Sequence, residues 1–373
     1  MKKYENKNLG ITLVALVITI VILLILAGIS ISALTNTGLF KKAKEAKEKT
    51  REAEENQTKT LSEYETALDQ YGDNTLVSKF NNGKIKVGDY ISYEPDVVTG
   101  IDEKYKTLIS NLKTYSGATE NTESTLVQDE LKWRVLDVKD RQVRLISATP
   151  TKSTIALNGY NGYNNAVKLL DDVCSTLYNN SKLASTVQNL KIEDLQDKMV
   201  EKDYTKFSSD YGNNHTIAGN KYYTDILQKE KEQTVNTLGT ELGISEQKEL
   251  TKQTEKKQAD NLNIKSTFWT KYTDKNDFNS SKYYELFINN EGFYSIYWLS
   301  SRCVNYDTSY GAGFNVFDVL SGNIYANRLG DSNGYERSDN FTYRPIITLK
   351  ADVQLDTIKS GDGSTAEQAY VIK

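Results

Sequence analysis

The stretch LKWRVLDVKDRQVRLISA at residues 131–148 decides the class of fold. Side chains of two kinds alternate from Trp133 to Val138, which is typical of a strand with one buried face, and the pattern resumes from Val143. Lys139-Asp140-Arg141 separates the two runs and predicts a turn, so the stretch indicates a β-hairpin. We expect Trp133 to anchor a hydrophobic core rather than to present a ligand platform.

Helix and strand signals on both sides of this hairpin predict an α+β fold class for the part of the chain beyond residue 75. Apolar residues at helical spacing predict a helix at 164–178, capped by Asn164 or Asn165, and a second short helix at 192–199. Residues 224–262 are rich in Lys, Glu, Gln and Thr, which predicts a polar helical insert. Short apolar runs separated by Asn, Ser, Gly and Asp predict strands at 84–93, 297–299, 314–320, 323–326, 346–349 and 370–373.

Length and composition exclude several classes of function. The 373 residues leave room for about two domains. Lys and Arg number 46 against 50 Asp and Glu, so the net charge is −4, and we expect no nucleic-acid partner. Two Cys and one His exclude a multi-Cys zinc module and a multi-histidine metal centre, and we expect neither a metal nor a cofactor.

Residues 11–34, ITLVALVITIVILLILAGISISAL, carry no charge and no proline. A helix of this length would cross a ~30 Å hydrocarbon core, so the segment predicts a single-pass transmembrane helix in contact with membrane lipid. The alternative is a cleaved secretory signal, whose apolar region is usually shorter. Apolar positions at helical spacing between Phe40 and Tyr71 predict that the helix continues to about residue 71, where Gly72 offers a stop.

The N-terminal residues KNLG at 7–10, followed by ITLVAL at 11–16, resemble the processing site of type IV prepilins. The resemblance implies that a prepilin peptidase cuts after Gly10, that Ile11 becomes the new N-terminus and a site of methylation, and that the outer domain is extracellular. The same form is found in pilin-like surface proteins of Clostridium-type Firmicutes. Ala15 stands where pilins usually carry Glu, which weakens the expectation of a filament of pilin subunits.

A second resemblance covers most of residues 80–350. YWLSSRCV at 297–304, GFNVFDVLSG at 313–322 and YRPIITL at 343–349 are similar to a C-terminal module of clostridial and gut-bacterial surface proteins that looks like a C-type-lectin-like fold. This resemblance implies an architecture rather than a chemistry. In such a fold the loops of the C-terminal part would form the exposed binding face.

Tyrosines and asparagines interleave in those loops. Tyr offers a large amphipathic contact area and Asn offers adaptable hydrogen bonds, the mixture that recognition loops use. The alternative is that Asn makes turns while Tyr packs the strands, and the sequence leaves both open. The candidate ligand-binding residues are Tyr306, Tyr310, Tyr325, Asn327, Asn333, Tyr335 and Asn340.

Other reactive residues give weaker signals. Carboxylates at Asp307, Asp318, Asp331 and Asp339 suit calcium chemically, but their spacing matches no loop motif, and we predict no metal site. Cys174 and Cys303 are candidates for one structural disulfide, with two buried thiols as the alternative. His215 has no evident partner in the sequence, and no nucleophile has an adjacent base, so we expect no enzyme.

The resulting expectation is a membrane-anchored, pilin-like surface protein that displays an adhesin-like domain for a carbohydrate or protein ligand. The alternative is a minor or structural subunit of a type IV pilus or pseudopilus, in contact with other pilin subunits and acting in assembly, secretion or DNA uptake. Both roles place the outer domain outside the cell, on a protein anchored in the cell membrane or assembled into a pilus. The expected parts are a leader at 1–10, a transmembrane and extended pilin-like helix at 11–72, a strand and helix part at 80–223, the insert at 224–262 and a C-type-lectin-like part at 263–373.

Overall fold

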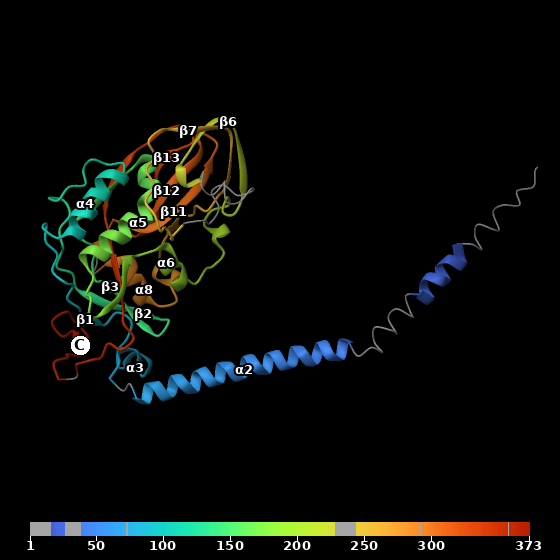
Figure 1. Ribbon diagram of the computed structural model, residues 1–373, viewed down its shortest axis with the longest axis horizontal. Helices are drawn as coiled ribbons and strands as arrows, with labels where there is room; N and C mark the ends of the chain where they lie inside the picture. The colour runs from blue at the N-terminus through green and yellow to red at the C-terminus, as the bar shows by residue number, and fades with distance from the viewer. Residues whose placement is uncertain are drawn as a thin grey trace, which may run out of the picture. The chain divides into compact units, whose positions relative to one another are not determined.

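The computed structural model of the protein describes residues 16–26, 39–71, 74–227, 244–290, 293–294, 296–356 and 358–373. The chain divides into two compact units, Met1–Gly72 and Asp73–Lys373. Figure 1 shows the helix α2 of the first unit and the mixed α+β arrangement of the second. The predicted leader at 1–10 and its cleavage site at Gly10 and Ile11 lie outside the described residues.

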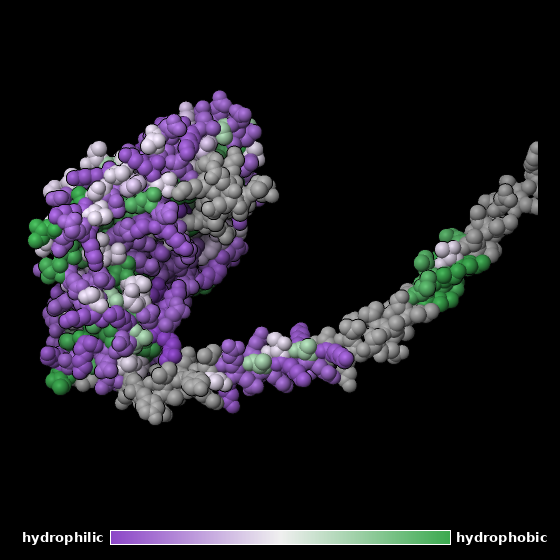
Figure 2. Space-filling model, viewed as in Figure 1, coloured by the Kyte–Doolittle hydropathy of each residue, from purple (hydrophilic) through white to green (hydrophobic). Residues whose placement is uncertain are grey.

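The first unit contains the helix α2, Leu39–Tyr71, which is 33 residues long and ends where the spacing predicts. A shorter helix covers residues 16–26. The side chains of this shorter helix are exposed and apolar, whereas the surface of α2 is mostly hydrophilic (Figure 2). The charged sequence of α2 explains the difference, because Lys and Glu recur along its first half.

The prediction of a transmembrane helix at 11–34 is wrong for the described residues. Among the described residues, no helix combines the length and the apolar character needed to cross a membrane. Residues 16–26 span roughly 16 Å as a helix, about half of a ~30 Å hydrocarbon core. The other residues of the predicted segment lie outside the described part of the chain.

The second unit is an α+β domain, as predicted. In its described residues two six-stranded sheets form, with strand orders β16-β1-β2-β3-β15-β5 and β4-β14-β11-β12-β13-β8, together with the two-stranded pairs β6-β7 and β9-β10. The strands of the first sheet are β1 Tyr90–Ser92, β2 Trp133–Lys139, β3 Gln142–Ser147, β5 Ala184–Asn189, β15 Pro345–Leu349 and β16 Tyr370–Val371. Those of the second sheet are β4 Thr154–Asn158, β8 Lys271–Tyr272, β11 Tyr297–Asp307, β12 Gly311–Leu320, β13 Asn323–Asp331 and β14 Ser338–Thr342. The pairs are β6 Asn214–Tyr223 with β7 Lys257–Lys265, and β9 Asn289–Asn290 with β10 Phe293–Tyr294.

The hairpin predicted at 131–148 is confirmed. Strands β2 and β3 pair antiparallel from Lys139 and Gln142 back to Trp133 and Ser147. Asp140 and Arg141 form the turn with positive φ angles of 50° and 60°, as a two-residue hairpin turn that matches the strand twist requires. Trp133 is 2% exposed and belongs to the core, as expected.

The helices of the second unit differ from the predictions at two places. Helix α5 begins at Gly159, with Asn158 at its N-cap, so Asn164 and Asn165 lie buried inside it rather than capping it. The described part of 224–262 is also not the predicted polar helix, because residues 257–262 belong to strand β7 and only 225–227 are helical. The helices of the domain are α3 Leu76–Asn81, α4 Glu103–Tyr115, α5 Gly159–Leu177, α6 Ile192–Lys198 and α8 Ser281–Phe287, with short 3-10 turns at η1 Tyr204–Lys206 and η2 Lys275–Asp277.

The hydrophobic core lies on both faces of the two sheets. Helices α4 and α5 share one cluster with side chains from both sheets, for example Trp133 and Val316. Helices α6 and α8 share a second cluster with residues that point the other way from the same strands, such as Leu136 and Phe317. The period of two along a strand explains why neighbouring residues enter opposite clusters. A third cluster fastens the β6-β7 hairpin to the end of the second sheet.

Arg344 stands where the chain passes from β14 in the second sheet to β15 in the first. Its side chain is 0% exposed. The guanidinium donates to the carbonyl oxygens of Ser147 at 2.7 Å and Ala148 at 3.1 Å, and to those of Leu286 and Phe287 in α8. Burial lowers the pKa of Arg344. These bonds tie the end of β3 to α8 and explain why an arginine precedes Pro345.

Candidate ligand-binding face

Tyr310, Asn333 and Tyr335, three of the predicted binding residues, come together at one end of the second sheet. Tyr310 lies in the turn between β11 and β12, and Tyr335 follows the end of β13. Both rings contact the guanidinium of Arg328, and Asn333 Nδ2 donates to the carbonyl oxygen of Ser309 in the same turn at 3.4 Å. We call Tyr310, Arg328, Asn333 and Tyr335 the tyrosine–arginine face.

Arg328 is the centre of this face, and sequence reasoning missed it. Its guanidinium carbon lies 3.9 Å from the ring centroid of Tyr310 and 5.4 Å from that of Tyr335. A cation this close to an aromatic face is held by the negative charge of the ring face. The signal in the sequence was a lone basic residue within NIYANRLGD at 323–331, a strand otherwise uncharged until its final Asp331.

Gly313 makes room for the face. A Cβ atom at Gly313 would lie 2.2 Å from Asn305 Oδ1, 3.1 Å from the Tyr310 ring and 3.3 Å from Arg328 Cδ. Asn305 Nδ2 donates to the Tyr310 hydroxyl at 2.9 Å, and Asn315 Nδ2 donates to Asn305 Oδ1 at 2.9 Å. The glycine therefore lets the Tyr310 ring and the Arg328 stem lie directly over strand β12.

The loop that carries Tyr335 is held by two sets of contacts. Asp331 Oδ1 accepts hydrogen bonds from the backbone N–H groups of Asn333 at 2.9 Å and Tyr335 at 3.3 Å. From strand β6, Lys221 Nζ donates to Asn333 Oδ1 at 2.8 Å, and the backbone N–H of Tyr222 donates to the loop at 2.9 Å. A loop fixed in this way presents Tyr335, which is 50% exposed, in a defined position.

Tyr306 lies on the opposite side of the second sheet from Tyr310 and Arg328. It is paired with Ala312, whereas its neighbour Asn305 is paired with Gly313, and successive strand residues point to opposite faces. Its ring stacks on the imidazole of His215, with centroids 4.1 Å apart and planes 9° apart. The structure therefore separates Tyr306 from the tyrosine–arginine face.

Tyr325, Asn327 and Asn340 also lie elsewhere. The Tyr325 hydroxyl is 3.1 Å from that of Tyr272, between β13 and β8. Asn327 Nδ2 donates to Asp318 Oδ2 at 2.6 Å, so its amide is engaged in the sheet. Asn340 is exposed on β14, opposite Ala156 of β4. These residues do not form one site with Tyr310 and Tyr335.

His215 has a partner that the sequence did not reveal. Its Nε2 lies 2.7 Å from Asp210 Oδ1 in the polar stretch before β6. The second oxygen of Asp210 is buried without a hydrogen-bond partner. In the described part of the chain the imidazole contacts Asp210 and Tyr306, and neither is placed as a nucleophile activated by the histidine.

The predicted disulfide between Cys174 and Cys303 is wrong. Both residues are free, buried cysteines. Cys174 belongs to the cluster shared with α4 and α5, and Cys303 belongs to the cluster on the other side of the sheets. Burial raises the pKa of both thiols. The alternative of two buried thiols describes them correctly.

The four aspartates considered for calcium do not gather into one cluster. Asp331 Oδ1 accepts a hydrogen bond from the Asn333 N–H in the loop after β13. Asp307 Oδ1 accepts from the Ser309 N–H at 2.7 Å, and Asp318 Oδ2 accepts from Asn327 Nδ2. Asp339 Oδ1 accepts from Nη2 of Arg337, the residue just before β14, at 2.7 Å. Among the described residues, no group of three or more His, Cys, Asp and Glu side chains is arranged to hold a metal ion.

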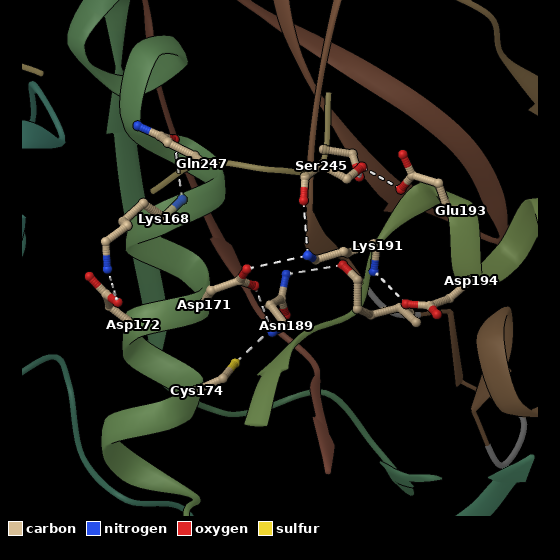
Figure 3. Close-up of polar contacts among 12 residues, drawn as sticks. Lys168, Asp171, Asp172, Cys174, Asn189, Lys191, Glu193, Asp194, Ser245 and Gln247 are labelled. Carbon is tan, nitrogen blue, oxygen red and sulfur yellow. Dashed lines mark hydrogen bonds and ion pairs between the residues drawn. The ribbon is translucent and has the colours of Figure 1, made fainter. Parts of the chain in front are cut away.

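A second set of polar contacts joins α5 to β5 and to the segment around Ser245 (Figure 3). Asp171 Oδ1 accepts from the Asn189 N–H at 3.0 Å, and Asp171 Oδ2 lies 3.6 Å from Lys191 Nζ. Lys191 also donates to the Ser245 carbonyl oxygen at 2.9 Å, and the Cys174 thiol points to Asn189 Oδ1 at 3.9 Å. Burial raises the pKa of Asp171 to about 6. These groups bond to one another, so we interpret the set as a structural junction.

A cavity of about 350 Å³ lies on the first sheet, away from the tyrosine–arginine face. Its lining includes Tyr93, Trp133, Glu94 and Glu130. The two aromatic rings are packed edge to face, 5.3 Å apart, and are almost fully buried. They belong to the core more than to a surface, so we do not place the main site here.

Comparisons with models of known protein families, with curated proteins and with solved structures find no match. The resemblance of residues 80–350 to a C-type-lectin-like module stays a prediction.

Proposed function

We propose that the unit Asp73–Lys373 is a recognition domain, which binds a glycan at a cell surface through the tyrosine–arginine face. The observation that carries the proposal is that the rings of Tyr310 and Tyr335 both pack against the Arg328 guanidinium at one end of the second sheet. Side chains already held in place lose little conformational entropy when a ligand binds, and this favours affinity. The proposal includes no catalytic step and no cofactor.

We also propose that the chain is a pilin-like surface protein, cut by a prepilin peptidase after Gly10. The support is the KNLG–ITLVAL motif at 7–16, together with the helix α2 between this motif and the domain. A location of the recognition domain outside the cell follows from that processing. The alternative role as a pilus or pseudopilus subunit stays a prediction.

The experiment that tests the binding proposal uses the purified full chain on an array of neutral and acidic glycans. Tyr335→Ala removes an exposed ring from the face without touching the core, and we expect affinity to fall about tenfold or more, as at a binding hot spot. Tyr272→Ala is the matched control, because Tyr272 is 74% exposed on β8, away from the face. Equal affinities of Tyr335→Ala and wild type, or no glycan bound by wild type, would contradict the proposal.

A further inference from the structure

Arg328 lies between two tyrosine rings at one end of the second sheet. Its stem lies over Gly313, and its guanidinium packs 3.9 Å from the Tyr310 ring centroid, with the Tyr335 ring 5.4 Å away. The side chain keeps 31% exposure. Contacts with two rings restrict where the guanidinium can lie, so its N–H groups are held at this end of the sheet.

The N–H groups of Arg328 are unused within the described residues. Its one charged contact is Asp331 Oδ2 at 3.6 Å, which is longer than a hydrogen bond. Other arginines of the sheets do donate: Arg134 Nε to Gly88 O at 2.7 Å, and Arg344 Nη2 to Ser147 O at 2.7 Å. A guanidinium has five N–H donors in a planar fork, so Arg328 presents a preformed set of donors to solvent.

Building on the proposed function, we propose that Arg328 receives the carboxylate of an acidic sugar, such as a uronic or sialic acid. An arginine fork pairs with a carboxylate through two parallel N–H···O bonds, a geometry that a lysine does not offer. The exposed ring of Tyr335 beside it provides a flat surface for the sugar ring. Asn333, also exposed, lies in the same loop as Tyr335.

The surroundings favour an acidic glycan over an acidic peptide. Peptide recognition usually relies on apolar or aromatic anchors that fill a pocket. Of the large apolar side chains exposed in the described residues, the tyrosine–arginine face contributes Tyr335 and no aliphatic residue. The rest of the face is made of hydroxyl, amide and guanidinium groups, which match a hydroxyl-rich ligand with one negative charge.

The test compares pairs of glycans with the full chain. The affinity for each sialic-acid or glucuronic-acid glycan is compared with the affinity for the same glycan whose carboxylate has been converted to the methyl ester. Wild type is expected to bind the free acid about tenfold or more tightly than the ester. Arg328→Gln is expected to abolish this preference, and Arg328→Lys to keep only part of it, since a lysine supplies charge without the fork.

Arg134→Gln is the matched control, because it removes an arginine that packs over the ring of Tyr90, at 5.1 Å, in the other sheet. It is expected to leave the preference for the acid unchanged. Thermal unfolding of each variant shows that it is folded. If the preference persists in Arg328→Gln, or if this variant loses acid and ester binding equally, the inference about the carboxylate is overturned while binding through Tyr335 stands. If wild type binds neither the acids nor the esters nor any neutral glycan, the proposed function itself fails.

Discussion

Asp318 shows at the scale of one residue how burial changes the chemistry of a side chain. It lies in β12 with 0% exposure, and its Oδ1 is buried without a hydrogen-bond partner. Burial is the largest cause that raises its pKa to about 7, and the charge of Asp339 adds to it. The hydrogen bond from Asn327 lowers the pKa, but by less than burial raises it. The folded protein therefore holds a proton on Asp318 more tightly than the unfolded chain does.

Replacing Asp318 is expected to change how stability depends on pH. The unfolded pKa is 3.8 and the folded pKa is about 7, so wild type loses stability as the pH rises from about 4 to about 7, by roughly 4 kcal/mol at most. Asp318→Asn carries no titrating proton, and its melting temperature should exceed that of wild type at pH 8 and approach it near pH 4. Thermal unfolding followed by circular dichroism at pH 4 to 8 measures this. Exposed Asp352→Asn serves as the control, and parallel curves for wild type and Asp318→Asn would contradict the assignment.

At the scale of elements, the loop at 331–335 depends on a hairpin that is distant in sequence. Gly334 has a φ of 91°, and a Cβ there would lie 2.9 Å from the Tyr222 ring of β6. Lys256 Nζ donates to the Gly334 carbonyl oxygen at 2.5 Å. The β6-β7 hairpin therefore forms one wall of the loop that positions Tyr335, although sequence analysis placed part of it in a polar insert.

Gly334→Ala is expected to be more destabilising than Gly219→Ala. Both glycines have a positive φ, 91° and 84°, so alanine costs about 1 kcal/mol of strain at either. Only Gly334 also faces a ring, while Gly219 has open space around it. We expect Gly334→Ala to lose about 1 kcal/mol or more beyond the loss in Gly219→Ala, and to weaken glycan binding because Tyr335 shifts. Urea unfolding measures the difference, and equal losses in the two variants would show that the Tyr222 contact has no effect.

At the scale of the whole molecule, the chain joins an N-terminal segment that contains α2 to a domain with its own core. The segment Met1–Gly72, which contains α2, and the domain Asp73–Lys373 are separate compact units. The domain buries large side chains on both faces of its sheets, among them Trp133, Trp269 and Trp298. Its fold therefore rests on contacts within its own residues.

Processing of the whole chain is expected to yield Ile11 as the N-terminus. Co-expression with a prepilin peptidase should remove residues 1–10, which intact mass and N-terminal sequencing detect. Gly10→Val is the control, since a bulky residue before the cut should block it. An intact Met1, or cleavage within residues 27–33, would reject the pilin-like proposal and leave the recognition domain without an assigned route to the surface.

Much of the secondary structure of the domain could be predicted, whereas the tyrosine–arginine face could be predicted only in part. The strands β2, β3, β12 and β15 lie where alternation or apolar runs indicate, because a strand shows its buried face locally. The apolar run at 11–34 predicted a spanning helix and was wrong in the described residues.

The sequence by itself determined the α+β class of the domain, the hairpin at 131–148 and the abundance of Tyr and Asn near the C-terminus. Only the tertiary structure decided that Tyr310 and Tyr335 enclose Arg328, that Tyr306 faces the other side, and that the two cysteines lie in different cores. The physical reason is that these relations depend on register and on long-range contacts, such as the bond between Lys221 and Asn333 across 112 residues. Local periodicity carries no information about which strands become neighbours.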